Sequence, residues 1–288
     1  MTKMSPTGCV IIAVFAGLMA ATAGPNAAHA QSLGFGRGNS DPIHIEADDG
    51  IEWQRTKQVY VARGNARASQ GGVTVEADVL IAHYRSTGPG ADEIYQIDAD
   101  GNVRILSDSE EATADKAVYD VVKGILILTG KRIRLVTAQD TIIARDSLEY
   151  YEDKQLAVAR GDALAIREDR RIRADTLMAH FIAKKGKKRS SKIDRIEAIG
   201  NVHISTATDI VTADRGDYQV NAGLATVTGD VKITRGETQL NGNRAEVNLN
   251  TGQSRLLTDA GSRKSGGRVR AIFKPAAPRE SDNSGKTQ

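Results

Sequence analysis

Two stretches of this sequence, RGNARASQGGVTVEADVLIAHY at Arg63–Tyr84 and RGDALAIREDRRIRADTLMAHF at Arg160–Phe181, align with each other without a gap. Each begins with Arg-Gly followed by Asn or Asp, and each ends in an Ala-Asp pair, an Ala-His pair and an aromatic residue. Self-similarity at a fixed spacing is typical of stacked supersecondary units that share one continuous core. The chain is therefore predicted to be a repeat protein.

Shorter copies of the same phrase recur between these two stretches and after them. The glycines that open the copies are separated by 37, 29, 31, 39 and 29 residues, and a longer period of 97 to 99 residues lies above this spacing. They are Gly64, Gly101, Gly130, Gly161, Gly200 and Gly229, and Ala-Asp pairs follow with aspartates at Asp78, Asp115, Asp175 and Asp214. We predict one body, residues 31–259, made of two tandem modules at about 40–158 and 159–259.

Residues next to these glycines alternate in polarity as β-strands do. The segments Val103–Ile105, Val202–Ile204 and Val231–Ile233 are apolar at every second position, which turns one face inward. Gly-Asn and Gly-Asp pairs tolerate positive φ, so we expect them to form turns between strands. The predicted fold is all-β, an elongated and twisted antiparallel jelly roll. A parallel β-helix is the alternative, although its repeats are shorter and more uniform.

The first 30 residues are predicted to be an export signal. Lys3 gives a weak positive charge, residues 9–23 are apolar, and Ala28-His29-Ala30 is a small-x-small cleavage site. The apolar segment is shorter than the roughly 20 residues that span a membrane, although an uncleaved anchor stays as the alternative. Cleavage after Ala30 predicts a periplasmic chain that lacks cysteine and therefore disulfides and cysteine ligands.

Net charge is unevenly distributed along the chain. The segment 260–288 carries a net charge of +5 and is rich in Gly, Ser and Lys, whereas residues 31–259 carry −3. We expect this tail to be disordered, because such compositions bury little apolar surface. A mildly acidic body argues against nucleic-acid binding, which requires a basic face.

No catalytic or metal-binding constellation emerges from the sequence. His83 and His180 occupy equivalent repeat positions, so repetition explains them better than metal ligation does. His44-x-Glu46 resembles part of a zinc-deaminase signature, but the cysteines of that signature are missing. The aspartates that recur in the Ala-Asp pairs are interpreted as structural, each fixing a bend through a hydrogen bond. We expect no enzyme activity, no cofactor and no metal.

The body resembles a known family at its beginning. The segments Asp41–Asp48 (DPIHIEAD), Gly64–Ala66 and Val75–Asp78 are similar to the start of OstA-like proteins, and the resemblance extends over about 40–259. It implies a partly open jelly roll whose interior binds lipid A acyl chains of lipopolysaccharide. It further implies a periplasmic bridge that contacts an inner-membrane anchor protein and an outer-membrane barrel protein, and that assembles head to tail. Two long loops predicted at Arg85–Glu93 and Lys184–Lys192, and the basic tail, depart from the family pattern.

An apolar groove suits this chemistry, because exposing an acyl chain of about a dozen methylenes to water costs roughly 10 kcal/mol. Alternate Val and Ile side chains would line such a groove, or would equally fill an ordinary dry core. The predicted groove residues are Val59, Val61, Val75, Val103, Ile105, Ile142, Ile166, Val202, Ile204, Val231 and Ile233.

The sequence is also compatible with two other functions. A secreted β-helix enzyme or binding module acting on acidic polysaccharide would cluster Asp, Arg or Lys on one face. A structural or adhesive repeat protein would have a close-packed interior that takes up no lipid. The basic run Lys184–Arg189 has two interpretations as well, a solvated loop or a contact with lipid A phosphates or an anionic membrane surface.

Overall fold

The computed structural model describes residues 42–88, 91–182, 193–248, 250–251, 253–257 and 270–272. The predicted signal peptide, the Lys184–Arg189 run and nearly all of the basic tail lie outside the described residues. Within the described part, no helix combines the length and the apolar character needed to cross a membrane.

These residues form one antiparallel sheet and a short 3-10 helix, η1 (Arg55–Lys57). The strands are β1 (His44–Glu46), β2 (Gly50–Gln54), β3 (Val59–Gln70), β4 (Val73–Gly88), β5 (Ala91–Leu106), β6 (Glu110–Asp120), β7 (Ile125–Thr129), β8 (Ile133–Thr137), β9 (Thr141–Ala144), β10 (Ser147–Tyr151), β11 (Leu156–Arg167), β12 (Arg170–Phe181), β13 (Ile193–Ser205), β14 (Asp209–Gln219), β15 (Leu224–Arg235), β16 (Thr238–Asn248), β17 (Gln253–Leu257) and β18 (Arg270–Ile272).

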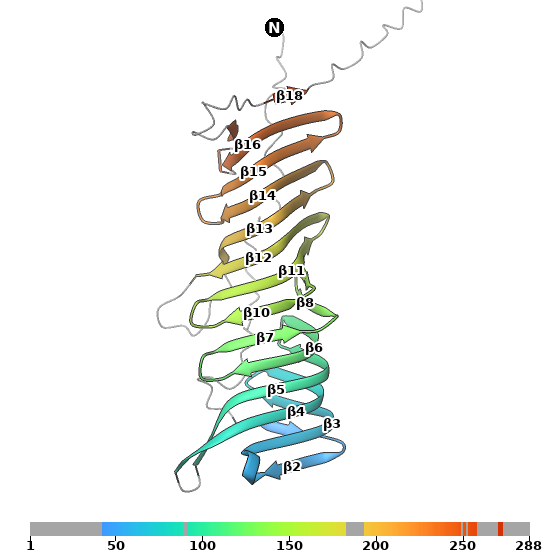
Figure 1. The fold of residues 1–288 in the computed structure, drawn as a ribbon, viewed down its shortest axis with the longest axis vertical. Coiled ribbons are helices and arrows are strands. Elements are labelled where there is room, and N and C mark those ends of the chain that lie inside the picture. Colours follow the sequence, from blue (N-terminus) through green and yellow to red (C-terminus); the bar gives the residue numbers. More distant parts are fainter. Residues whose placement is uncertain are drawn as a thin grey trace, which may run out of the picture.

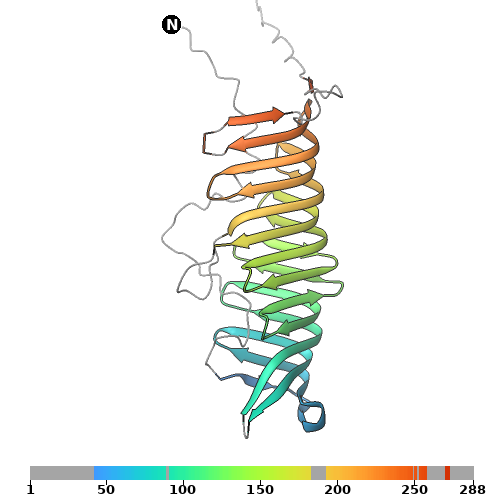
Figure 2. The same cartoon turned by 60° about the vertical axis from the view of Figure 1, so that its left-hand side comes forward.

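The strands stack in sequence order along the long axis of the molecule, from β2 at one end to β16 at the other (Figure 1). The long strands pair antiparallel with their sequence neighbours, as β3 does with β4 and β15 with β16. Figure 2 shows that they also curve round one side of the molecule, so that each contributes to two facing layers. The predicted antiparallel jelly roll is confirmed, and the parallel β-helix is excluded.

The curvature comes from β-bulges at the Gly-Asn and Gly-Asp pairs. In the β3–β4 ladder two residues, Gly64 and Asn65, lie opposite the single residue Asp78. The same arrangement places Gly101–Asn102 opposite Asp115, Gly161–Asp162 opposite Asp175, and Gly200–Asn201 opposite Asp214. A bulge bends its strand and increases the local twist. The Gly-Asn and Gly-Asp pairs and the aspartates of the Ala-Asp pairs therefore lie together at the bend between the two layers.

The prediction that these pairs form turns between strands is wrong. Gly101 has φ +81° and Asn102 has φ +47°, so the positive φ expected of them is present, but both residues lie inside β5. The chain reverses elsewhere, for example at Gly71–Gly72 between β3 and β4. A bulge and a tight hairpin need the same backbone conformation, and the dipeptide alone does not distinguish them.

We name the two layers by their strands. Wall A contains β2, β7, β10 and β17 and the parts of the long strands that pair with them, such as residues 79–88 of β4 and 176–181 of β12. Wall B contains β1, β8, β9 and β18 and the remaining parts, such as residues 73–77 of β4 and 170–174 of β12. At mid-length each long strand is replaced by two short ones, β7 with β8 and β9 with β10.

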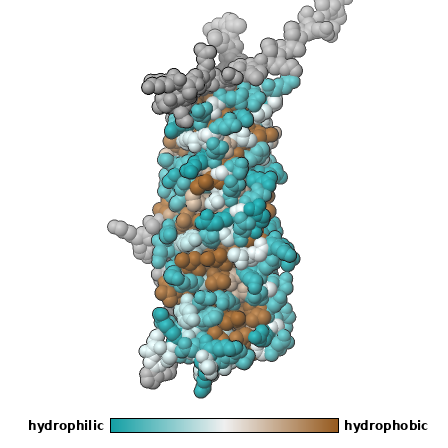
Figure 3. Space-filling view, in the orientation of Figure 1, coloured by the Kyte–Doolittle hydropathy of each residue, from teal (hydrophilic) through white to brown (hydrophobic). Residues whose placement is uncertain are grey.

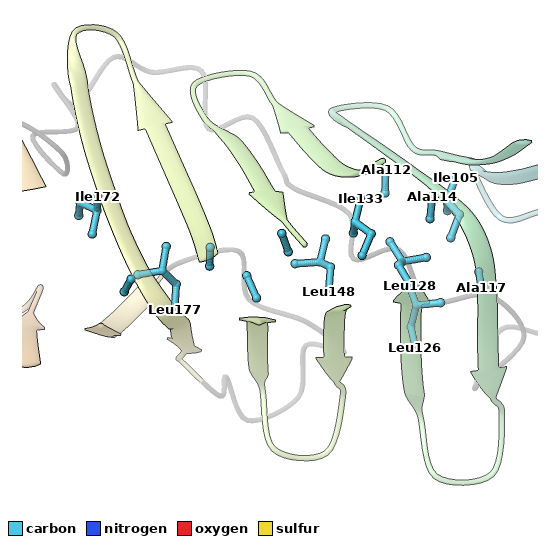
Figure 4. Close-up of a cluster of buried hydrophobic side chains, with 14 of the residues drawn as sticks. Ile105, Ala112, Ala114, Ala117, Leu126, Leu128, Ile133, Leu148, Ile172 and Leu177 are labelled. Atoms are coloured by element: carbon cyan, nitrogen blue, oxygen red, sulfur yellow. The ribbon is translucent and has the colours of Figure 1, made fainter. Parts of the chain in front are cut away.

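The core fills the space between the walls. In Figure 4, Leu126 and Leu128 of wall A point toward Ile133 and Ala112 of wall B. Leu128 and Ile133 are each only 1% exposed, so their side chains are packed on all sides. The cluster continues through most of the stack, from Ala66 in β3 to Ala245 in β16. The outer surface is mostly hydrophilic, with separate apolar patches on the face seen in Figure 3.

Candidate functional site

The interior of wall B is lined by one row of side chains that runs along the whole stack. The row starts at Ile45 and follows the strand pairings through Ala68, Val75, Ile105, Ala112, Leu135, Ile142, Ala165, Ile172, Ile204, Val211, Ile233 and Leu240. Every member is apolar, and residues directly opposite each other in neighbouring strands share a face. The row therefore gives wall B a continuous apolar surface.

Eight of the predicted groove residues lie in this interior. Val75, Val103, Ile105, Val202, Ile204, Val231 and Ile233 belong to the buried core cluster, and Ile142 is partly buried against it. The alternation in the sequence therefore indicated the correct face for these eight. Their lipid-binding role stays a prediction.

Three of the predicted groove residues do not share that face. Val59 and Val61 are buried but alternate with Tyr60 and Ala62, whose side chains face the interior, and neither valine belongs to the core cluster. Ile166 is partly buried and alternates with Ala165, a neighbour of the core. The register therefore places these three on the outer side of the walls, which corrects their predicted place in the groove.

Aromatic residues on the inner face of wall A were not among the predicted site residues. Tyr84, Tyr119 and Tyr218 are 5–6% exposed, and they follow the aspartates of the Ala-Asp pairs in their strands by four to six residues. That spacing was visible in the sequence, and it could have identified them. The Tyr119 hydroxyl donates a hydrogen bond to Glu152 at 2.9 Å, so this ring has a polar tip at the margin of the interior.

An apolar hollow of about 30 Å³ opens at the β2 end of the stack. It is lined by Ile43, Ile45, Ile51, Tyr60, Ala62, Ala68, Leu80, Ala82, Ile94 and Ile97. Beside it Trp53 is 48% exposed, donates from Nε1 to the Tyr84 hydroxyl at 2.7 Å, and lies under the Arg55 guanidinium. The β2 end of the stack thus presents apolar and aromatic surface beside this hollow.

Wall B carries charged residues where its inner face reaches the hairpins. We call this margin the wall B lip, and define it by Glu110, Thr137, Asp140, Arg167, Asp209 and Arg235. Arg167 donates to both carboxylate oxygens of Asp140, at 2.7 and 2.5 Å. Arg235 donates to both oxygens of Asp209, at 2.5 and 2.6 Å. Burial raises the pKa of Glu110 from 4.5 to about 7.

The polar groups outside the interior are held in structural pairs. His83 and Asp98 lie 2.8 Å apart, and His180 and Glu197 repeat this pair in the second module at the same distance. Asp175 accepts hydrogen bonds from the Asn201 amide at 3.1 and 2.9 Å across the bulge, which agrees with the structural interpretation of the recurring aspartates. No cluster of potential metal ligands occurs among the residues with assigned positions.

A polar hollow lies on the outer side of the bend near mid-length. It is lined by Arg145, Asp146, Arg160, Gly161, Asp162, Arg173, Ala174, Asp175, Thr176, Asn201 and His203. Its acidic groups are already engaged: Asp146 with Arg145, Asp162 with Arg173, and Asp175 with Asn201. General acid–base chemistry on a polysaccharide needs a carboxyl group within reach of the substrate. In this hollow each of the three carboxyl groups is held by an arginine or an asparagine of the same surface.

Comparison with known proteins identifies relatives of the chain. The family model described as "LptA/(LptD N-terminal domain) LPS transport protein" matches residues 44–146 and 210–271, which is more than half of the chain. The structure of LptH, described as the LptA homologous periplasmic component of the lipopolysaccharide transport device from Pseudomonas aeruginosa, matches at 10% identity with a TM-score of 0.21. That match covers 82% of this chain and 96% of LptH. No curated protein matches the sequence.

Proposed function

Because this chain belongs to the LptA/LptD N-terminal domain family of lipopolysaccharide transport proteins, we propose that it binds lipopolysaccharide in the periplasm and shields the acyl chains between its walls. The observation that carries the proposal is the unbroken apolar row of wall B, from Ile45 to Leu240. An acyl chain lying along this row is removed from water, at about 0.8 kcal/mol for each methylene buried. Catalysis has no part in the proposal.

The walls must separate for a lipid to enter. Val103, Val202 and Val231 are 0–2% exposed, so their own side chains occupy the space that acyl chains would need. The bulges join the walls along one side, and the hairpins of wall A and wall B end on the opposite side (Figure 2). We infer that the walls open at the hairpin side, because opening there breaks no strand pairing.

The proposed role within the family is that of a bridge between the two membranes. In the described residues β2 pairs only with β3 at one end, while β17 and β18 pair only with β16 at the other. Such edges leave backbone groups that can pair with a further strand. We propose that the β1–β2 edge meets an inner-membrane anchor protein and the β17–β18 edge an outer-membrane barrel protein.

A photo-crosslinking experiment tests the lipid-binding interior. His203 and Ile204 are neighbours in β13, but Ile204 is 2% exposed inside the core and His203 points outward. A crosslinking amino acid at Ile204 is expected to label lipopolysaccharide in cells, and the same amino acid at His203 is the matched control. Mass spectrometry of the labelled band identifies the lipid. Equal labelling at both positions, or no labelling at Ile204, would contradict an interior lipid site.

A further inference from the structure

The wall B lip contains one position that is repeated in both modules. Glu110 begins β6 and Asp209 begins β14, two strands of 11 residues with the same inward and outward alternation. The hairpins before them share one backbone hydrogen bond, Ser107 N–H to Glu110 O and Thr206 N–H to Asp209 O, both 2.9 Å. The two carboxyl groups therefore occupy equivalent places at the margin of the apolar interior.

The carboxyl groups of Asp209 and Glu110 face different residues across the strand ladder. Asp209 faces Arg235 across the ladder, and the guanidinium holds both carboxylate oxygens in a bidentate pair. Glu110 faces Thr137 at the corresponding register position, so no arginine is available there. No hydrogen bond or ion pair reaches the Glu110 side chain from any residue that the structure describes. The Ser107 hydroxyl beside it is buried and also lacks a partner.

The surroundings of Glu110 do not compensate its charge. Asp140 and Arg167, which also belong to the lip, are paired with each other. Glu111 is on the opposite face of β6 and pairs with Arg104. Burial is the only cause that raises the pKa of Glu110, so neither a neighbouring cation nor a neighbouring anion dominates it. An incoming cation would meet a carboxylate that nothing else neutralises.

We propose that Glu110 is an open acceptor for an ammonium or guanidinium group, and that this group belongs to the headgroup of the carried lipid. Arg235 shows the arrangement from within the chain, because it places a guanidinium on the equivalent carboxylate of the second module. Glu110 lies between the ends of the stack rather than at a strand edge, and the apolar row at Ala112 and Leu135 adjoins it. A lipid with its acyl chain on that row brings its headgroup to the lip.

This inference rests on the proposed function, since it assumes an acyl chain in the interior. It adds that amine-bearing amphiphiles are preferred over neutral ones of equal length. The preference should grow as the pH rises from 5.5 to 8, because Glu110 becomes ionised while an alkyl ammonium stays protonated like a lysine. A charge-assisted hydrogen bond of this kind corresponds to about tenfold in affinity.

The test uses isothermal titration calorimetry of the full mature chain with decylamine and with decanol, both below their aggregation concentrations. At pH 8 the protein is expected to bind decylamine about tenfold more tightly than decanol. Glu110→Gln should remove this preference. Thr137→Arg should remove it as well, because it supplies the cation that Arg235 supplies in the second module. Circular dichroism melting verifies that both variants are folded.

The outcomes separate this inference from the proposed function. Equal binding of decylamine and decanol, or a preference that persists in Glu110→Gln, overturns the cation acceptor and leaves the apolar interior supported. Binding of neither amphiphile overturns the proposed function and this inference together. If Glu110→Gln does not fold, Thr137→Arg decides, since it keeps the carboxylate and places a cation opposite it. Thr137→Val is its control, because it loses the same hydrogen bonds from the Gln139 and Asp140 N–H groups.

Discussion

The Asn102 side-chain amide donates hydrogen bonds to both carboxylate oxygens of Asp78, at 3.2 and 3.0 Å. The two residues are on neighbouring strands, β5 and β4, where the walls join. Asn201 and Asp175 repeat the contact in the second module. Each bend therefore has a carboxylate from one strand held against a bulge of the next, which fixes the bend that separates wall A from wall B.

Replacing Gly101 by alanine should destabilise this bend. Gly101 has φ +81°, and a Cβ there would lie 2.1 Å from Asp78 Oδ2. A left-handed alanine costs roughly 1–2 kcal/mol before the steric clash is added, so we expect Gly101→Ala to lose about 2 kcal/mol or more. Urea denaturation measures the loss. Gly88→Ala is the matched control, because nothing lies within 4 Å of a Cβ at that position. Equal stability of the two variants would contradict the proposed role of the bulge.

The two layers and most of the interior could be predicted from the sequence. Alternation at Val202 and Ile204 indicated the inner face, because the period of a strand is two and the core is apolar. The outward placement of Val59 and Val61 could not be predicted in this way. Both are buried although the register places them on the outer face of wall A, so apolar character alone did not show which side they occupy.

The bends and the lip depend on contacts between residues distant in sequence. Whether Gly101 forms a turn or a bulge is decided by Asp78 on the preceding strand and Asp115 on the following one. The pairing of Asp209 with Arg235, 26 residues away, depends on the register of β14 and β15. A repeat identifies equivalent positions, but it does not reveal the residue across the ladder. The different partners of Glu110 and Asp209 therefore follow from the strand register and could not be predicted from the repeat.

Glu110 should make stability depend on pH. Its pKa is raised from 4.5 to about 7 in the folded chain, so the native state binds more protons than the unfolded state between these values. Stability that is fully present below pH 4.5 is then lost as the pH rises through 7. The loss amounts to about 3 kcal/mol. Glu110→Gln cannot ionise, so it should equal the wild type at pH 4.5 and exceed it at pH 8.5 in urea denaturation.

Two outcomes would argue against this linkage. A wild type with the same pH dependence as Glu110→Gln would show that the folded carboxyl titrates normally. A variant that is less stable than the wild type at pH 8.5 would show that the charge is compensated. Asp108→Asn is the control for net charge, because Asp108 is an exposed neighbour in the same hairpin.

Arg235→Ala should be one of the costliest single changes in the second module. The Asp209 side chain is 1% exposed, and removal of Arg235 leaves its charge buried without a counter-ion. Breaking a buried pair on one side costs about 3–5 kcal/mol at neutral pH. Asp209→Asn combined with Arg235→Ala should recover much of this loss. Additive losses in a double-mutant cycle, measured by urea denaturation, would contradict the coupling.

The two ends of the stack should allow copies of the chain to meet end to end. β2 closes wall A at one end of the stack and β17 closes wall A at the other, while β1 and β18 are the corresponding strands of wall B. Unlike ends give heterologous contacts, which extend as filaments instead of closing as dimers. If copies stack by strand addition, β17 of one copy lies beside β2 of the next.

Cysteine crosslinking tests this arrangement. A double variant with Glu52→Cys in β2 and Arg255→Cys in β17 carries one cysteine at each end of wall A. Treatment with a short bismaleimide should give a ladder of dimers, trimers and longer species on a denaturing gel. Either single variant should yield no species beyond a dimer, because one cysteine per chain cannot extend the ladder. Lys116→Cys combined with Glu52→Cys is the matched control, since Lys116 is 60% exposed on the outer face of mid-stack β6. A ladder of equal intensity from this control would show that collisions alone produce it, and the end-to-end model would then be wrong.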